Sequence, residues 1–215
     1  MKTAVIFDLD GVIVSTDEFH YRAWKIIADE EGIPFDHEAN NALRGVSRME
    51  SLEIILTRSS KVYNNDEKIK MSEKKNSHYL VFLESLTPND ILPGVKPLLQ
   101  SLKDMKIPIA IGSSSKNANP ILKKIGLEDM FDAVVDGNMI SNSKPDPEVF
   151  NLAAKLLKKV PDECVVIEDA ESGIEAAKRA NMFAVGIGAS VINTNADVLI
   201  TDLTHLDIKA ILDGE

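Results

Sequence analysis

The sequence predicts an α/β fold in which a parallel sheet is interrupted once by an all-helical insertion. Short apolar runs recur along the chain without the polar and apolar alternation of half-exposed strands, as expected where both faces of a sheet are covered. Helical patterns separate most of these runs, and such alternation of strand and helix favours parallel pairing. The long stretch between the first and second runs breaks this order, because it contains one helical pattern after another.

The expected strands are continuous apolar segments. They cover residues 4–7 (AVIF), 107–112 (IPIAIG), 133–135 (AVV), 164–167 (CVVI) and 183–188 (FAVGIG), with a weaker segment at 196–200 (ADVLI). Helices are expected where apolar residues recur with helical spacing, at residues 95–105, 120–125, 148–157 and 174–180. Cys164 begins one of the strands, which predicts a buried structural thiol.

The insertion spans residues 16–87 and is expected to form a helical cap on the sheet. Ser15 with Glu18, and Ser47 with Glu50, have the spacing of the capping box that opens a helix. A further helical pattern runs over residues 66–84 and ends before the prolines and glycine of TPNDILPG. The predicted organisation is therefore a first core segment at 1–15, a cap at 16–87 and the rest of the core at 88–215.

Composition excludes several classes of protein. With 44% hydrophobic and 27% charged residues the chain has the balance of an ordinary globular protein. A net charge of −10 argues against a general nucleic-acid or anionic-membrane surface. The apolar run before Asp8 is too short for a secretion signal, and no run approaches a membrane span. A cytoplasmic protein without nucleic-acid or membrane partners is expected, and a monomer.

Two pairs of carboxylates follow expected strands. Asp8 and Asp10 lie two residues apart and so point to the same side, and Glu168 and Asp169 end the strand that begins at Cys164. The carboxyl ends of parallel strands meet at the edge where open α/β folds bind ligands. Two like charges about 4 Å apart repel by roughly 4 kcal/mol at an effective dielectric constant near 20. The pairs therefore predict a magnesium site, with solvated turns as the alternative.

Two other strand ends carry groups that suit phosphate. Ser113, Ser114 and Ser115 follow the second strand and precede Lys116 and Asn117, which places hydroxyl and backbone donors near a helix start. Lys144, in SNSKPDP, supplies a point charge that can offset phosphate and carboxylate. Taken singly, a serine-rich turn and a lysine before proline are compatible with solvated loops.

The order DLDG, serine, lysine and ED resembles the haloacid dehalogenase superfamily, whose core is a Rossmann-like parallel sheet. The resemblance implies that Asp8 is a nucleophile that forms an aspartyl phosphate and that Asp10 is the general acid and base. It also implies Mg²⁺ held by Asp8, the backbone carbonyl of Asp10 and Asp169, with Glu168 close by. Ser113 and Lys144 would hold the transferring phosphoryl group.

The insertion resembles the cap of the sugar-phosphate mutases of that superfamily, in the segments EFHYRAW (18–24), RGVSRMESL (44–52) and KKN (74–76). The resemblance implies that four residues grip the phosphate that is not transferred: Arg48, Ser115, Lys116 and Asn117. It implies that five contact the sugar, the first two through their backbone: Gly45, Val46, Ser51, Lys75 and Asn76. It further implies that His20 helps to position Asp10.

Some of these residues also have structural interpretations. His20 shares a helical face with Trp24 and Ile27, so a packed core histidine is the alternative to a site residue. Lys75 belongs to the charge run EKKN, which is typical of a solvated face. Arg48 lies in the first turn of an expected helix, where a cation is unfavourable to the helix dipole, so a structural role is weaker there.

The resemblance implies interconversion of β-glucose 1-phosphate and glucose 6-phosphate, with Mg²⁺ as cofactor and glucose 1,6-bisphosphate as intermediate. A sugar-phosphate phosphatase of the same superfamily is the first alternative. A phosphoacceptor signalling module is the second, although such modules carry no helical insertion and usually end their first strand in adjacent acids. The preferred sugar stays open at this level.

Overall fold

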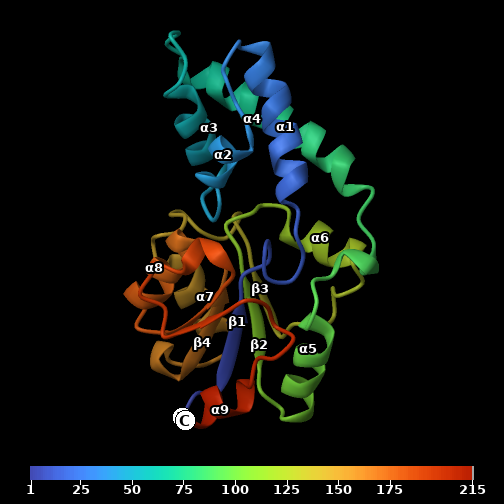
Figure 1. Cartoon of the computed structure of the whole chain (residues 1–215), viewed down its shortest axis with the longest axis vertical. Helices are drawn as coiled ribbons and strands as arrows, with labels where there is room; N and C mark the ends of the chain where they lie inside the picture. Colours follow the sequence, from blue (N-terminus) through green and yellow to red (C-terminus); the bar gives the residue numbers. More distant parts are fainter. Residues whose placement is uncertain (215) are drawn as a thin grey trace.

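A computed structural model describes residues 1–214 (Figure 1). Within them six strands form one parallel sheet in the order β3-β2-β1-β4-β5-β6. The strands are β1 (Ala4–Phe7), β2 (Ile109–Gly112), β3 (Ala133–Val135), β4 (Cys164–Glu168), β5 (Phe183–Ile187) and β6 (Val198–Ile200). The register places Val5 beside both Ile109 and Val165. The predicted α/β fold with a parallel sheet is confirmed.

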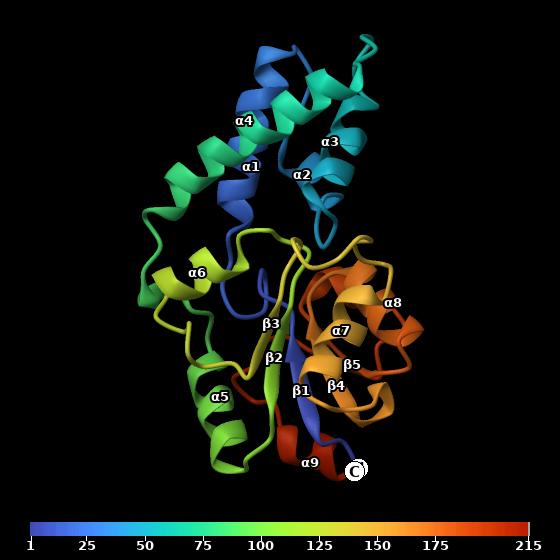
Figure 2. The ribbon, with the colours of Figure 1, turned by 180° about the vertical axis from the view of Figure 1, so that it is seen from behind.

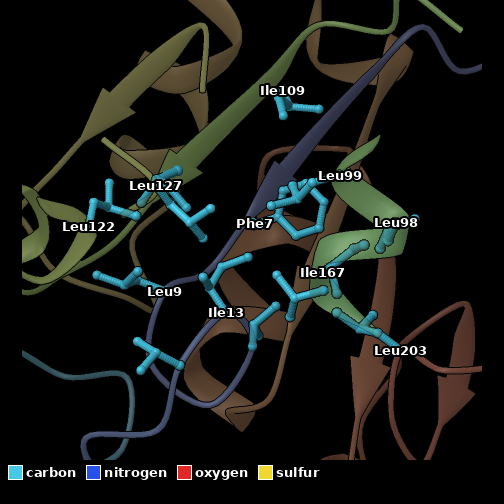
Figure 3. Close-up of a cluster of buried hydrophobic side chains, with 14 of the residues drawn as sticks. Phe7, Leu9, Ile13, Leu98, Leu99, Ile109, Leu122, Leu127, Ile167 and Leu203 are labelled. Carbon is cyan, nitrogen blue, oxygen red and sulfur yellow. The ribbon is translucent and has the colours of Figure 1, made fainter. Parts of the chain in front are cut away.

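The two faces of β1 are buried in different hydrophobic clusters, which is why its sequence is apolar throughout. Val5 and Phe7 belong to one cluster with residues of α5 (Val95–Asp104), α6 (Ala118–Lys124) and α9 (Ile208–Asp213). Figure 3 shows Phe7 in this cluster together with Leu99 and Leu122. Ala4 and Ile6 pack on the other side with α7 (Glu148–Leu156) and α8 (Glu171–Arg179). All four strand residues have no exposed surface. Cys164 is buried in the second cluster, as predicted.

Four helices follow β1 in the sequence and precede α5: α1 (Asp17–Glu30), α2 (His37–Asn41), α3 (Arg48–Leu56) and α4 (Asn65–Leu83). They have a hydrophobic core of their own, in which Trp24 packs with residues such as Ile27, Leu52 and Ile55. Figures 1 and 2 show this group over the end of the sheet to which β1 points. Short 3-10 helices cover Pro88–Asp90, Pro161–Glu163 and Ala189–Val191.

One of the two expected capping boxes is present. Ser47 and Glu50 form a complete box at the start of α3. The capping box predicted at Ser15 is wrong. Helix α1 begins after Thr16, and the Thr16 side chain makes no capping hydrogen bond. The Thr16 amide and hydroxyl both donate to Asp10 instead, at 2.6 Å each.

Most expected elements differ from the structure by one to three residues at an end. The expected strands at 107 and 196 begin two residues later, at Ile109 and Val198, and the helix expected at 174 begins at Glu171. Pro108 lacks an N–H group, so it cannot extend the ladder of β2 toward its N-terminus. In residues 1–214 no helix is both long and apolar enough to span a bilayer.

Candidate active site

A cavity of about 370 Å³ lies where the carboxyl ends of β1 and β2 face the helical insertion. Its core wall includes the predicted residues Asp8, Asp10, Ser113, Ser115, Lys116, Asn117 and Asp169, and its wall from the insertion includes His20, Gly45, Val46, Arg48, Ser51 and Lys75. Lys144 and Glu168 are completely buried next to Asp8. The structure therefore brings residues from both ends of the chain and from the insertion to one place.

Three of the four predicted carboxylates form one group. Ligand atoms of Asp8, Glu168 and Asp169 all lie within 4.8 Å of one another, which makes this group a candidate metal site. Gly11 permits the approach, because a Cβ there would lie 2.1 Å from an Asp169 carboxylate oxygen. The Asp10 carboxylate is directed to Thr16 instead. A role for Asp10 at the metal would thus use its backbone carbonyl.

Lys144 is the cation that lies inside this group. It lies in the segment between β3 and α7, precedes a cis peptide bond to Pro145 and has no exposed surface. Its Nζ lies 2.5 Å from Asp8 Oδ1 and 2.7 Å from Glu168 Oε2. One ammonium cannot balance three carboxylates: burial, and then the charge of Asp8, raise the pKa of Glu168 to about 7. The surplus negative charge and the oxygen ligands fit a hard divalent cation.

Asp10 belongs to a network that starts at the entrance to α1. Its oxygens accept hydrogen bonds from Thr16, and the Thr16 hydroxyl lies 2.8 Å from the hydroxyl of Tyr79 on α4. His20 Nε2 lies 3.6 Å from Asp10 Oδ2, so the two side chains are neighbours. Burial raises the pKa of Asp10 to about 6. The hydrogen bonds from Thr16 lower this pKa, but their effect is smaller than that of burial. A carboxyl with that pKa can both donate and accept a proton near neutrality.

Lys75 is buried, so the expected alternative of a solvated face is wrong. It is 2% exposed, and its Nζ lies 2.9 Å from His20 Nδ1. The same nitrogen lies 5.0 Å from the ring centroid of Trp24 and 4.6 Å from that of Tyr79. Burial, reinforced by the charge of Arg48, lowers the pKa of Lys75 well below its usual value. An anionic ligand in the cavity would relieve this positive potential.

The loop after β2 carries the predicted anion-binding groups. Ser113 is 3% exposed, and its hydroxyl accepts from the amide of Ser115 at 3.1 Å. The Asn117 side-chain amide donates to the side-chain oxygen of Asn76 on α4 at 3.0 Å, so Asn76 contacts the core loop. Across the cavity, burial lowers the pKa of Arg48. Cations and amides from the core and the insertion thus face one space.

Arg44 and Thr16 also contact site residues, although no motif in the sequence predicted either of them. The Arg44 guanidinium lies 2.7 Å from Asp17 Oδ2 and 3.8 Å from Asp169 Oδ2, so it connects the insertion to the carboxylate group. A cation directly before the predicted Gly45 was the available signal for Arg44. No spacing rule identifies Thr16, because its bonds to Asp10 depend on how the chain turns into α1. Trp24 both packs in the core of the insertion and lines the cavity.

Comparisons with known proteins agree with this geometry. The model of the haloacid dehalogenase-like hydrolase family matches residues 2–181. The chain is 45% identical over 208 residues to the beta-phosphoglucomutase of Bacillus subtilis (strain 168), covering 96% of this chain and 92% of that protein. It is 35% identical to the phosphorylated carbohydrates phosphatase of Thermotoga maritima, over 83% of this chain and 82% of that protein.

A solved structure is similar over almost the whole chain. The crystal structure of beta-phosphoglucomutase (pgmB) from Clostridium difficile superposes with a TM-score of 0.93 at 41% identity, covering 99% of this chain and 96% of that one. The resemblance inferred from the motifs is therefore confirmed. The chain belongs to the haloacid dehalogenase-like hydrolase family.

Proposed function

We propose that this enzyme is a magnesium-dependent β-phosphoglucomutase, which interconverts β-D-glucose 1-phosphate and D-glucose 6-phosphate through glucose 1,6-bisphosphate. The observation that carries the proposal is that Arg48 from the insertion and Lys116 from the core line the same cavity as Asp8. A mutase needs such an arrangement, because one phosphate must be anchored while the other is transferred. The identity of 45% to the Bacillus subtilis beta-phosphoglucomutase supports it.

Asp8 is the proposed nucleophile. A carboxylate oxygen of Asp8 forms a bond to phosphorus, the bond from phosphorus to the sugar oxygen breaks, and the sugar oxygen takes a proton from Asp10. Lys144 holds Asp8 Oδ1 at 2.5 Å, and Ser113 lies at the end of the neighbouring strand to donate to the phosphoryl oxygens. Bound Mg²⁺, held by Asp8, Asp169 and the Asp10 carbonyl, would offset the charge on the phosphoryl group.

The second phosphate and the sugar are proposed to bind between insertion and core. Arg48, Ser115, Lys116 and Asn117 would hold the phosphate that is not transferred, and Gly45, Val46, Ser51, Lys75 and Asn76 would contact the sugar. His20 would position Asp10. We take residues 16–87 as a cap that closes over the substrate, with 1–15 and 88–215 as the core. Closure would protect the aspartyl phosphate from water while the bisphosphate turns around.

The test is a coupled assay that contains β-glucose 1-phosphate, Mg²⁺ and trace glucose 1,6-bisphosphate. The proposal expects glucose 6-phosphate with little free phosphate. Arg48→Ala should cripple this turnover and leave aspartyl-phosphate formation from a small donor largely intact, because a small donor needs no second anchor. Equal loss of both activities would refute the role of Arg48.

A sugar-phosphate phosphatase is the second candidate, favoured by the identity of 35% to the phosphorylated carbohydrates phosphatase of Thermotoga maritima. Rapid release of free phosphate without glucose 6-phosphate in the same assay would support it. Steady turnover of either kind would exclude a phosphoacceptor signalling module. We further propose that the protein is a cytoplasmic monomer. Size-exclusion chromatography with light scattering tests the oligomeric state.

A further inference from the structure

The loop that follows β3 is hydrogen-bonded to the loop proposed to anchor the second phosphate. The amide of Gly137 donates to the carbonyl of Ser115 at 3.0 Å. The Asn138 side-chain amide donates to the carbonyl of Lys116 at 3.1 Å. Two successive residues of the anchor loop are thus held through their backbone carbonyls, and both side chains line the cavity.

The side chain of Asp136 accepts hydrogen bonds that hold the loop after β3 in place. It is 4% exposed, and its Oδ1 accepts from the backbone amide of Asn138 at 2.8 Å. Its Oδ2 accepts from the side-chain amide of Asn138 at 3.1 Å and from that of Asn119 on α6 at 3.4 Å. Hydrogen bonds to a charged acceptor are stronger than neutral ones. One buried carboxylate therefore ties the end of β3 directly to Asn119 at the start of α6 and, through Asn138, to the backbone of Lys116.

The contact leaves no room for a side chain at residue 137. A Cβ on Gly137 would lie 2.4 Å from the carbonyl oxygen of Ser114 and 3.1 Å from Cγ of Lys116. The first distance is to backbone, which cannot move aside as a flexible side chain can. The two loops are consequently in direct contact at the base of the Lys116 side chain.

We propose that Asp136, Gly137 and Asn138 form a positioning clamp that sets the place of the second-phosphate anchor relative to Asp8. The proposal rests on the proposed anchoring role of Ser115, Lys116 and Asn117. Because β2 lies between β3 and β1 in the sheet, the clamp holds the anchor at a fixed offset from the nucleophile. The clamp would thus favour substrates in which the distance from the anchored phosphate to the reacting oxygen matches the distance from the anchor to Asp8.

The test separates binding of the sugar phosphate from chemistry at Asp8. The dissociation constant of glucose 6-phosphate for the Mg²⁺-loaded enzyme is measured by calorimetry, and kcat/KM is measured for hydrolysis of acetyl phosphate, which has a single phosphate. Asn138→Ala and Asp136→Asn should raise the dissociation constant about tenfold, since small misplacement of a binding group is costly. They should leave kcat/KM for acetyl phosphate within about twofold of wild type.

Asp132→Asn is the matched control, because Asp132 lies at the opposite end of β3 and accepts the amide of Ile109 at 2.8 Å. It should leave both quantities at wild-type values. Asn138 is exposed, so its variant stays informative if Asp136→Asn fails to fold. An unchanged dissociation constant in Asn138→Ala, or parallel loss of both quantities, would overturn the clamp. Absence of mutase activity in the wild type would refute the proposed function. The dissociation constants and the acetyl phosphate kinetics of the variants would still test the clamp.

Discussion

Replacement of Lys144 by methionine should destabilise the metal-free protein strongly. The ammonium lies 2.5 Å from Asp8 and 2.7 Å from Glu168 with no exposed surface, so Lys144→Met leaves two buried carboxylates without their cation. Removal of one partner of a buried ion pair costs about 3–5 kcal/mol of unfolding free energy. For a protein of this size, that loss corresponds to a fall in Tm of about 6–20 °C.

The assay is urea unfolding followed by circular dichroism, with EDTA and again with saturating Mg²⁺. Bound Mg²⁺ replaces part of the lost positive charge, so it should stabilise Lys144→Met more than it stabilises the wild type. Lys74→Met is the control, because its partner Glu30 lies at the surface and such exposed pairs contribute little. A loss below about 1 kcal/mol in EDTA would refute the view that Lys144 neutralises the carboxylates.

The dependence on pH gives a second readout of the same variant. In the folded protein the pKa of Glu168 is raised to about 7, above its unfolded value near 4.3, so the folded state binds more protons between these values. Stability from this group therefore falls as pH rises through that window. Without Lys144, which opposes the shift, the pKa rises further. The deficit of the variant should then grow from pH 6 to pH 8.

Three further outcomes are expected. Arg44→Gln should tighten Mg²⁺ binding in calorimetry, because it removes a cation 3.8 Å from Asp169; weaker binding would contradict this. Gly173→Ala should lower Tm markedly, since its Cβ would lie 2.0 Å from the Glu168 carboxyl carbon, and an unchanged Tm would show that the helix start adjusts freely. Glu148 accepts three hydrogen bonds that lower its pKa. Glu148→Gln should therefore lower Tm at pH 7, and the difference from wild type should shrink below about pH 4. A difference in Tm that stays constant with pH would count against this.

The sequence predicted the sheet well because the sheet is buried on both faces. Continuous apolar runs such as AVIF and AVV match β1 and β3 residue for residue. Asp8 and Asp169 were expected near each other because the carboxyl ends of parallel strands meet at one edge, and the pairing of β1 with β4 brings them together. These predictions needed only periodicity and the geometry of parallel strands.

Other features of the site depend on where side chains point, which the spacing of residues in the sequence does not determine. Asp10 shares a side of the strand end with Asp8, yet the turn at Gly11, with φ +86°, lets its carboxylate reach the Thr16 amide. Lys75 sits in a charged run but faces Trp24. Burial of a lysine next to an aromatic ring depends on how α4 packs on α1, and local composition carries no record of that packing.

The hydrogen bond of 3.0 Å between Asn76 and Asn117 joins the cap to the core through two uncharged amides. A bond of this kind has a net strength of about 0.5–1.5 kcal/mol, which biases the joined form by roughly two- to twelvefold and no more. This bond alone therefore adds little to the free energy that holds residues 16–87 against the core. If the two amides separate, one donor and one acceptor become available to a ligand, so this contact, one of several between the insertion and the core, costs little to break.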